Sequence, residues 1–312
     1  MSTCETTTAT SATRPAAAHR SGARVGASMA LTSMLCVQVG LALSVGLIDQ
    51  VGTQGAVWLR LAGAAVLMPL IVRPRRSDYT AASFRICVLL GLAIGAVTML
   101  FMEAIARLPL GTASALEFLG PLGVAVVMGR GTARVWALVA GAGVVLLTEP
   151  WSGDIDPVGV GFALAAAVGW AAYILLTQKA GDQVSGISAL AVSMPVAALM
   201  ATVVGGPSVV GALTWELVLV GLGLAILLPV LPFALEMLAL RRLTTAAFGT
   251  LMALEPAIAL LVGLVVLQQV PTWLGVLGIA LVVAAGVGAE RTGARPPTPV
   301  DLAPEPVPVQ KA

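Results

Sequence analysis

The chain has 312 residues, of which 58% are hydrophobic and only 10% are charged, and its mean hydropathy is +0.99. Soluble globular proteins average about 25% charged residues, so this composition excludes a soluble protein with an ordinary charged surface. The net charge of +2 is too small to indicate a nucleic-acid-binding surface. The composition indicates an integral membrane protein whose function lies inside the bilayer.

The N-terminal segment, residues 1–24, is rich in Thr, Ser and Ala and has no periodicity. We expect it to be a disordered tail. The apolar run that follows, from Val25 to Ile48, is about twice as long as the core of a signal peptide, and no cleavage motif follows it. This run is therefore predicted to be the first membrane helix.

Nine more apolar runs follow along the chain. A helix needs about 20 apolar residues to cross the hydrocarbon layer. The ten predicted membrane helices are 25–48, 54–72, 84–104, 110–128, 133–148, 157–178, 187–204, 215–237, 244–266 and 271–289. Residues 290–312 form a Pro-rich polar tail that we expect to be disordered. The predicted fold class is an all-α integral membrane protein with ten transmembrane helices.

The positive charges fall in every second gap between the apolar runs. Fifteen of the 17 Lys and Arg residues lie in these alternate segments or, for Arg85 and Arg134, at the very start of the run that follows; Arg60 lies within the second run and Arg107 in an opposite gap. Positively charged segments near membrane helices stay in the cytoplasm. This pattern predicts a multi-pass protein of a bacterial cytoplasmic membrane with both termini in the cytoplasm.

The two halves of the chain resemble each other. The matching stretches, at offsets of 135 to 138 residues, are 102–108 with 237–243, 115–117 with 253–255, and Trp136 and Gly141 with Trp273 and Gly278. Each half, 25–148 and 157–289, holds five predicted helices, so the second half enters the membrane from the opposite side. Inverted repeats of this kind are typical of secondary transporters.

Two carboxyl groups lie near the middle of predicted membrane helices, at matching places in the two repeats. These are Glu117 and Glu255. A carboxylate at that depth costs roughly 2.5–3.5 kcal/mol on insertion scales, so both are candidates for binding a substrate ammonium or carrying a proton. The alternative is that each one forms a hydrogen bond near Pro121 or Pro256, where backbone groups need partners.

Three further residues are candidates for a substrate site. Arg60 in the second helix could extend to the headgroups, pair with Glu117, or bind a substrate carboxylate through its forked guanidinium group. Trp170 and Tyr173 in the sixth helix could form an aromatic cavity wall or only pack against other helices. No metal or cofactor site is predicted. The chain lacks a nucleophile–base pair and a nucleotide-binding loop, so we expect a protein that is not an enzyme and that uses a gradient, most simply of protons.

Several stretches are similar to a known family. The ten-helix, five-plus-five pattern resembles the EamA-type transporters of the drug/metabolite transporter superfamily. Residues 115–121, Ala-Leu-Glu-Phe-Leu-Gly-Pro, resemble the fourth helix of threonine/homoserine exporters of the Rht type, and residues 58–61, 169–173 and 254–256 resemble other parts of the family. The resemblance covers roughly residues 25–289 and implies the fold and a secondary transporter.

The leading hypothesis is therefore the export of a small metabolite, with an amino acid such as threonine or homoserine as the cargo. Glu117 and Arg60 could bind the two charged ends of such a zwitterion. One alternative keeps the fold but exports drugs or lipophilic cations. Others are an intramembrane lipid-modifying enzyme, for which no polar cluster is evident, and a membrane protein without transport activity.

Overall fold

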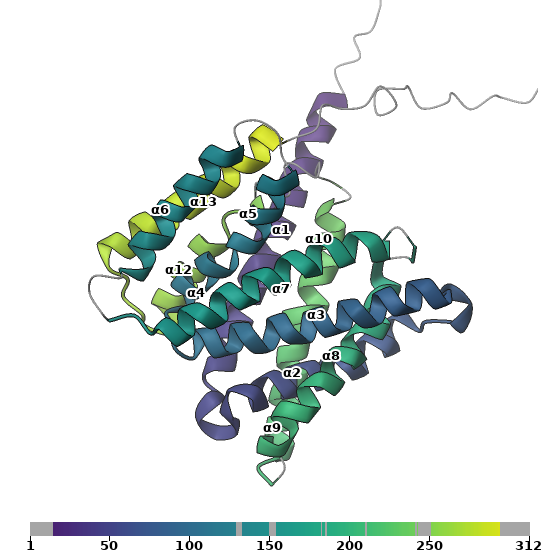
Figure 1. Cartoon of the computed structure of the whole chain (residues 1–312). Helices are drawn as coiled ribbons and strands as arrows, with labels where there is room; N and C mark the ends of the chain where they lie inside the picture. Colours follow the sequence, from purple (N-terminus) through teal and green to yellow (C-terminus); the bar gives the residue numbers. More distant parts are fainter. Residues whose placement is uncertain are drawn as a thin grey trace, which may run out of the picture.

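A computed structural model describes residues 15–128, 133–149, 154–181, 183–184, 186–209, 211–240, 242 and 251–293. These residues form helices joined by short connections, with no strand among them (Figure 1). The elements are α1 (Pro15–Val45), α2 (Ile48–Val72), η1 (Arg76–Asp78), α3 (Ala81–Ile105), α4 (Leu110–Glu117), α5 (Leu119–Met128), α6 (Ala133–Thr148), α7 (Pro157–Gly181), α8 (Gly186–Val209), α9 (Trp215–Ala225), η2 (Ile226–Val230), α10 (Leu231–Leu240), α12 (Glu255–Val266) and α13 (Trp273–Gly293).

The first helix is longer than the sequence pattern predicts. Helix α1 begins at Pro15, so the expected disordered segment 1–24 is helical from that residue onward. Proline is favoured in the first turn of a helix, and the alanines that follow have the highest helix propensity. At the other end of the chain, α13 continues to Gly293. The rest of both expected tails, and residues 244–250 of the expected ninth helix, lie outside the described residues.

Many helices are long and apolar enough to cross a bilayer. Six of those described meet both conditions, and four shorter apolar helices accompany them. Large apolar side chains such as Leu138, Val168 and Val203 are more than 70% exposed, as expected for surfaces that face lipid. The chain is thus a multi-pass membrane protein.

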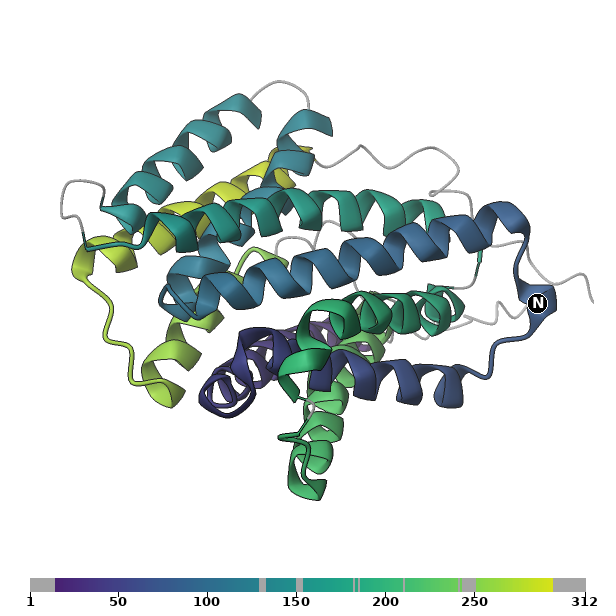
Figure 2. The same cartoon turned by 60° about the horizontal axis from the view of Figure 1, so that its bottom comes forward.

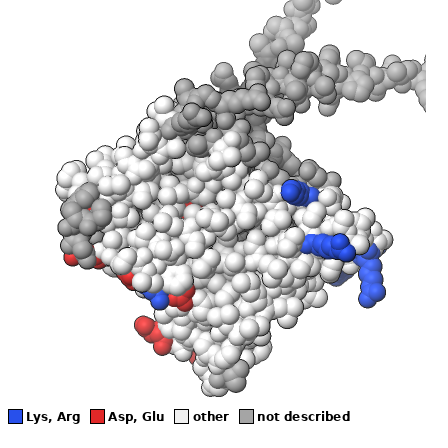
Figure 3. All heavy atoms as spheres, viewed as in Figure 1, with Lys and Arg blue, Asp and Glu red and all other residues white. Residues whose placement is uncertain are grey.

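Charged side chains gather at two opposite ends of the helices. Figure 3 shows most of the visible Lys and Arg at one end and most Asp and Glu at the other, where one basic side chain also lies. Exposed Arg73, Arg75 and Arg85 lie at or near the connection between α2 and α3, whereas Asp49 and Glu216 lie in the first turns of α2 and α9. The wide surface between the two ends is almost free of charge in this view, as a membrane-embedded surface requires.

The helix packing has an internal symmetry. The first set comprises five members in chain order: α1, α2, α3, α4 together with α5, and α6. The corresponding members of the second set are α7, α8, the segment from α9 to α10, α12, and α13. Helix α2 packs on α8, α4 on α12, and α6 on α13, and each of these pairs joins corresponding members of the two sets (Figures 1 and 2). The other large contacts between the sets come in pairs, and exchanging the two sets turns one member of each pair into the other. The contact of α3 with α7 corresponds to that of α1 with α10. The contact of α3 with α8 corresponds to that of α2 with α9, and the contact of α4 and α5 with α7 corresponds to that of α1 with α12.

Proline residues interrupt two of the membrane-crossing segments. Pro121 lacks an amide proton, and its ring would clash with the carbonyl of the residue four positions earlier, which is Glu117; α4 ends at this residue and α5 begins at Leu119. Pro229 has the same relation to Ala225, where α9 changes into the π-helical segment η2. Each helix is therefore interrupted four residues before a proline, where the proline removes a backbone hydrogen bond.

Small residues bring the paired helices close together. A Cβ atom added to Gly143 of α6 would lie 2.8 Å from the carbonyl oxygen of Gly278 in α13, and one added to Gly278 would lie 2.7 Å from the carbonyl oxygen of Gly143. The two backbones thus cross almost in contact. Close approach of this kind stabilises helix pairs in a bilayer, where apolar side chains gain little by leaving lipid.

Candidate functional site

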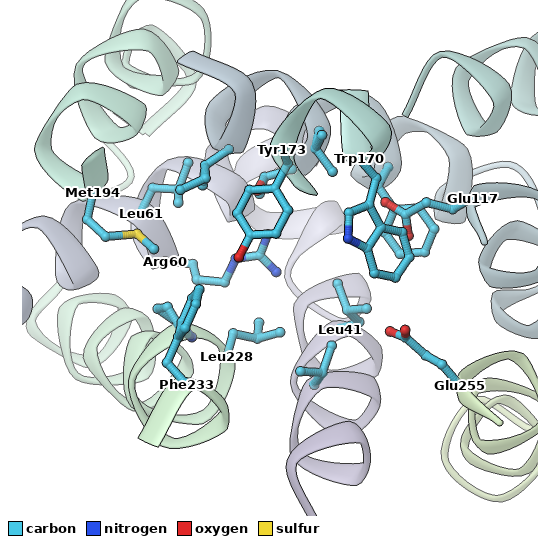
Figure 4. Close-up of a pocket in the computed structure, with 16 residues that line it drawn as sticks. Leu41, Arg60, Leu61, Glu117, Trp170, Tyr173, Met194, Leu228, Phe233 and Glu255 are labelled. Carbon is cyan, nitrogen blue, oxygen red and sulfur yellow. The ribbon is translucent and has the colours of Figure 1, made fainter. Parts of the chain in front are cut away.

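A cavity of about 220 Å³ lies between the two sets of helices (Figure 4). Its lining residues come from nine elements: Val37, Leu41, Arg60, Leu61, Ile94, Val97, Thr98, Phe101, Glu117, Trp170, Tyr173, Met194, Leu228, Pro229, Phe233 and Glu255. All five residues that the sequence identified as candidates are among them: Glu117, Glu255, Arg60, Trp170 and Tyr173. The structure therefore brings these candidates together in one place, although they are up to 195 positions apart between Arg60 and Glu255.

The two carboxyl groups enter the cavity at helix ends within the membrane. Glu117 is the last residue of α4 and is 7% exposed, while Glu255 is the first residue of α12 and is 8% exposed. Glu255 thus lies at a helix N-terminus, where the partial positive charge of the backbone favours an anion. Pro256 is compatible with this position, because the backbone N–H groups of the first helical turn have no partner within the helix and proline lacks only such an N–H group.

Helix α1 supplies a polar partner that the sequence reasoning missed. Gln38 is only 1% exposed, and its Nε2 atom donates a hydrogen bond of 3.2 Å to Glu255 Oε1. The available signal was an amide side chain in the middle of a long apolar run. Gln38 is not among the residues that line the cavity, and this hydrogen bond holds one oxygen of the Glu255 carboxyl group.

Arg60 is buried inside the protein and lines the cavity. Its side chain does not extend to the headgroups, because the residue is only 6% exposed. That alternative from the sequence is therefore wrong. Arg60 also forms no ion pair within 4.0 Å with Glu117 or Glu255, since both ion pairs found among the described residues involve Arg107. Its guanidinium group remains available on the cavity side.

Three buried polar atoms around the cavity have no hydrogen-bond partner among the described residues. They are Arg60 Nη1, Glu255 Oε2 and Gln38 Oε1. Buried donors and acceptors are nearly always paired in proteins, because an unpaired one costs about 1–3 kcal/mol. Of these residues, Arg60 and Glu255 line the cavity, so the site holds one positively charged donor and one acceptor that a bound molecule could satisfy. A ligand with a carboxylate and an ammonium group has the matching chemistry.

The rest of the lining is apolar and aromatic. In Figure 4 Trp170 lies on the side of Glu117, and the Tyr173 hydroxyl points into the cavity on the side of Arg60. Phe101 and Phe233 add two more rings. A mostly apolar cavity with a few convergent polar groups is typical of small-molecule binding sites.

Comparison with known proteins identifies the family. The profile of the EamA-like transporter family matches residues 157–288. The threonine/homoserine exporter RhtA of Salmonella typhimurium (strain LT2) is 35% identical over 272 residues, which is 86% of this chain and 92% of that protein. RhtA of Escherichia coli (strain K12) is 36% identical over 267 residues, which is 84% of this chain and 90% of that protein. The chain belongs to the EamA-like transporter family.

This membership confirms the family resemblance drawn from residues 58–61, 115–121, 169–173 and 254–256. The similarity to the RhtA proteins extends over most of the chain, whereas the family profile covers only its second half. The family and these relatives are named for transport, and no catalytic family is indicated. The cavity is therefore the natural place to look for a transport site in this EamA-like protein.

Proposed function

We propose that this protein is a secondary transporter that exports a small amino acid, threonine or homoserine, from a bacterial cytoplasm in exchange for protons. The observation that carries the proposal is the cavity itself. It places a buried cationic donor, Arg60 Nη1, and a buried anionic acceptor, Glu255 Oε2, without partners around one small space. A zwitterion that enters a low-dielectric site must have both of its charged ends satisfied. The names of the RhtA relatives support the same substrate class.

The size of the cavity also favours a small cargo. Pockets for drug-sized ligands have volumes of about 300–1,000 Å³. The cavity here has about 220 Å³. An amino acid with a short polar side chain suits this volume better than a large lipophilic cation does. Thr98, at the cavity wall, offers a hydroxyl group that could bind the side-chain hydroxyl of the cargo.

Alternating access would come from two inverted five-helix repeats, 25–148 and 157–289. The helix contacts support this arrangement, because exchanging the two sets maps each major contact between them either onto itself or onto another major contact. The breaks beside Glu117 and Glu255 also support it, since broken helices near the midplane form the substrate sites of many transporters. In this proposal both termini lie in the cytoplasm, at the end of the molecule where Lys and Arg gather.

Proton coupling follows from the charge balance of the cavity. Two carboxyl groups and one guanidinium group line it, so the charges do not cancel when all three are ionised. An uncompensated charge in the membrane is costly, so either a proton or the ammonium group of the cargo should neutralise a carboxylate. If the two compete for the same carboxyl group, protons and cargo move in opposite directions.

Export of a lipophilic cation is the second candidate, because four aromatic rings line the cavity. Inverted membrane vesicles with an imposed pH gradient can separate the two functions. The wild-type protein should take up threonine but much less threoninol, which keeps the ammonium group and lacks the carboxylate. Arg60→Gln should lower threonine uptake about tenfold or more and remove the preference over threoninol, because a hydrogen bond to a charged group is worth about 1.5–3 kcal/mol.

Arg85→Gln is the matched control, because it removes an exposed guanidinium group at the start of α3 and should leave uptake unchanged. Uptake of a lipophilic cation but not of threonine by the wild-type protein would contradict amino-acid export. That result would favour export of a lipophilic cation instead, above all if Arg60→Gln left the uptake of the cation unchanged.

A further inference from the structure

Glu236 on α10 is a carboxyl group to which the proposed export cycle gives no role. It lies almost one helical turn after Phe233, which lines the cavity, and it is partly buried. Two cavity residues, Tyr173 and Glu255, interact with Glu236 electrostatically. Glu236 therefore lies beside the cavity without forming part of its wall.

The hydroxyl group of Ser33 on α1 faces Glu236. Ser33 is fully buried, and its Oγ atom lies 2.8 Å from Glu236 Oε1 and 3.3 Å from the carbonyl oxygen of Pro232. A serine hydroxyl has one proton, so it can donate to only one of these acceptors at a time. The second acceptor becomes important when the carboxyl group changes its protonation state.

Both protonation states of Glu236 are satisfied by the same arrangement of atoms. When Glu236 is ionised, Ser33 donates its proton to the carboxylate. When Glu236 binds a proton, the new O–H group donates to Ser33 Oγ, and the serine proton turns to the Pro232 carbonyl oxygen. Neither state leaves a buried polar group without a partner at this contact. The Pro232 carbonyl oxygen thus gives the serine proton a second acceptor when Glu236 is protonated.

The surroundings place Glu236 between the cavity and the basic end of the molecule. Helix α10 packs on α1 and η2. On α1 the other titratable groups whose side chains are described are Cys36 and Arg24, and η2, Ile226–Val230, has none. Beyond the end of α10 at Leu240, Arg242 is exposed and donates to the Leu238 carbonyl oxygen at 3.4 Å. Glu236 lies four residues before the end of α10, a rise of about 6 Å along the helix.

We propose that Glu236 and Ser33 form a proton-binding site through which the coupling proton leaves the cavity toward the cytoplasm. In this step the Glu236 carboxylate takes a proton from a protonated carboxyl group of the cavity, and Ser33 turns toward Pro232. Glu236 then gives the proton to cytoplasmic water, and Ser33 turns back. The inference rests on the proposed function, because it requires a proton-coupled exporter.

Glu236→Gln in proteoliposomes tests the site with two assays. The first is exchange of labelled threonine for unlabelled threonine at equal pH, which needs cargo binding but no net proton movement. The second is threonine uptake driven by a pH gradient. Because Gln keeps an acceptor for Ser33 but cannot take a proton, exchange should persist, while driven uptake should fall about tenfold or more. Glu216→Gln, an exposed carboxyl group on α9, should change neither rate by more than about twofold.

The outcomes separate this inference from the proposed function. Driven uptake that survives in Glu236→Gln would overturn the proton site, and so would loss of exchange together with driven uptake in a folded protein. Absence of threonine exchange in the wild-type protein would instead overturn the proposed function.

If Glu236→Gln does not fold, Ser33→Ala provides the test. An ionised Glu236 loses its donor in this variant, so driven uptake should reach half of its maximum at a higher pH than in the wild-type protein. An unchanged pH profile would overturn the inference.

Discussion

At the scale of single residues, the backbone holds Glu117 and Glu255 in different ways. Glu117 ends α4, because Pro121 disrupts the hydrogen bond to its carbonyl, and Glu255 begins α12 directly before Pro256. Only Glu255 has a side-chain partner among the described residues, the amide of Gln38 at 3.2 Å. The Glu117 carboxyl group therefore has more freedom to exchange a proton or a ligand.

Glu117→Gln should impair transport much more than folding. Glutamine keeps the shape and can accept a hydrogen bond, but it cannot carry a charge or exchange a proton. We expect threonine transport to fall about tenfold or more from about pH 5.5 to about pH 8, because a contact between two charged groups is lost. The measurement is the uptake rate together with the thermal stability of the purified protein. Normal transport over that pH range would exclude both roles of Glu117.

The sequence predicted which residues meet at the cavity better than it predicted their partners. Arg60, Glu117 and Glu255 are identifiable because charges are rare and costly inside membrane helices. Gln38 and Ser33 are not identifiable in this way, because an amide or hydroxyl group in an apolar helix is common. Their importance depends on α1 packing against α10 and α12 of the other set, which is a tertiary contact that no local pattern specifies.

At the scale of helices, the sequence predicted the apolar runs well and their internal geometry less well. The fourth expected helix, 110–128, consists of α4 and α5 with a break at Phe118, and the eighth, 215–237, contains the π-helical segment η2. Two prolines, Pro229 and Pro232, lie in the eighth run; prolines favour a bend or a break but do not fix its exact form. Hydropathy reports where a helix can cross the membrane, but the way a broken turn closes depends on neighbouring helices.

The crossing of α6 and α13 gives a prediction at this scale. Gly143→Val should destabilise the protein, because the added side chain meets the backbone at Gly278, and overpacking of this kind costs about 1–3 kcal/mol. Gly141→Val is the matched control on the same helix, since a Cβ atom there meets nothing within 4 Å. The measurement is the free energy of unfolding of both variants in a detergent titration. Equal stability of the two variants would contradict the close crossing.

At the scale of the whole molecule, the charge distribution bears on the proposed orientation and the helix packing on the proposed repeat. The exposed arginines between α2 and α3 lie at one end, and Asp49 and Glu216 lie at α2 and α9 termini toward the other. The paired contacts of the two helix sets support an inverted repeat, in which the second set repeats the first upside down. The charges are consistent with the proposed cytoplasmic termini, and the contacts are consistent with the proposed pair of repeats.

Cysteine labelling tests this orientation. In a background without Cys4, Cys36 and Cys87, a cysteine at Ser77, in the connection between α2 and α3, should react only with a reagent that reaches the cytoplasm. A cysteine at exposed Gln50, near the start of α2, should react with an impermeant reagent outside intact cells. The opposite accessibility at both positions would contradict the topology.

The central claim is that an amino acid and protons move in opposite directions through one cavity. The most direct measurement is the pH inside proteoliposomes that contain a trapped pH-sensitive dye and the purified protein. Addition of external threonine or homoserine should make the lumen more alkaline, because each entering amino acid drives protons out, and Glu117→Gln should abolish this response. An unchanged or more acidic lumen with the wild-type protein would contradict the account.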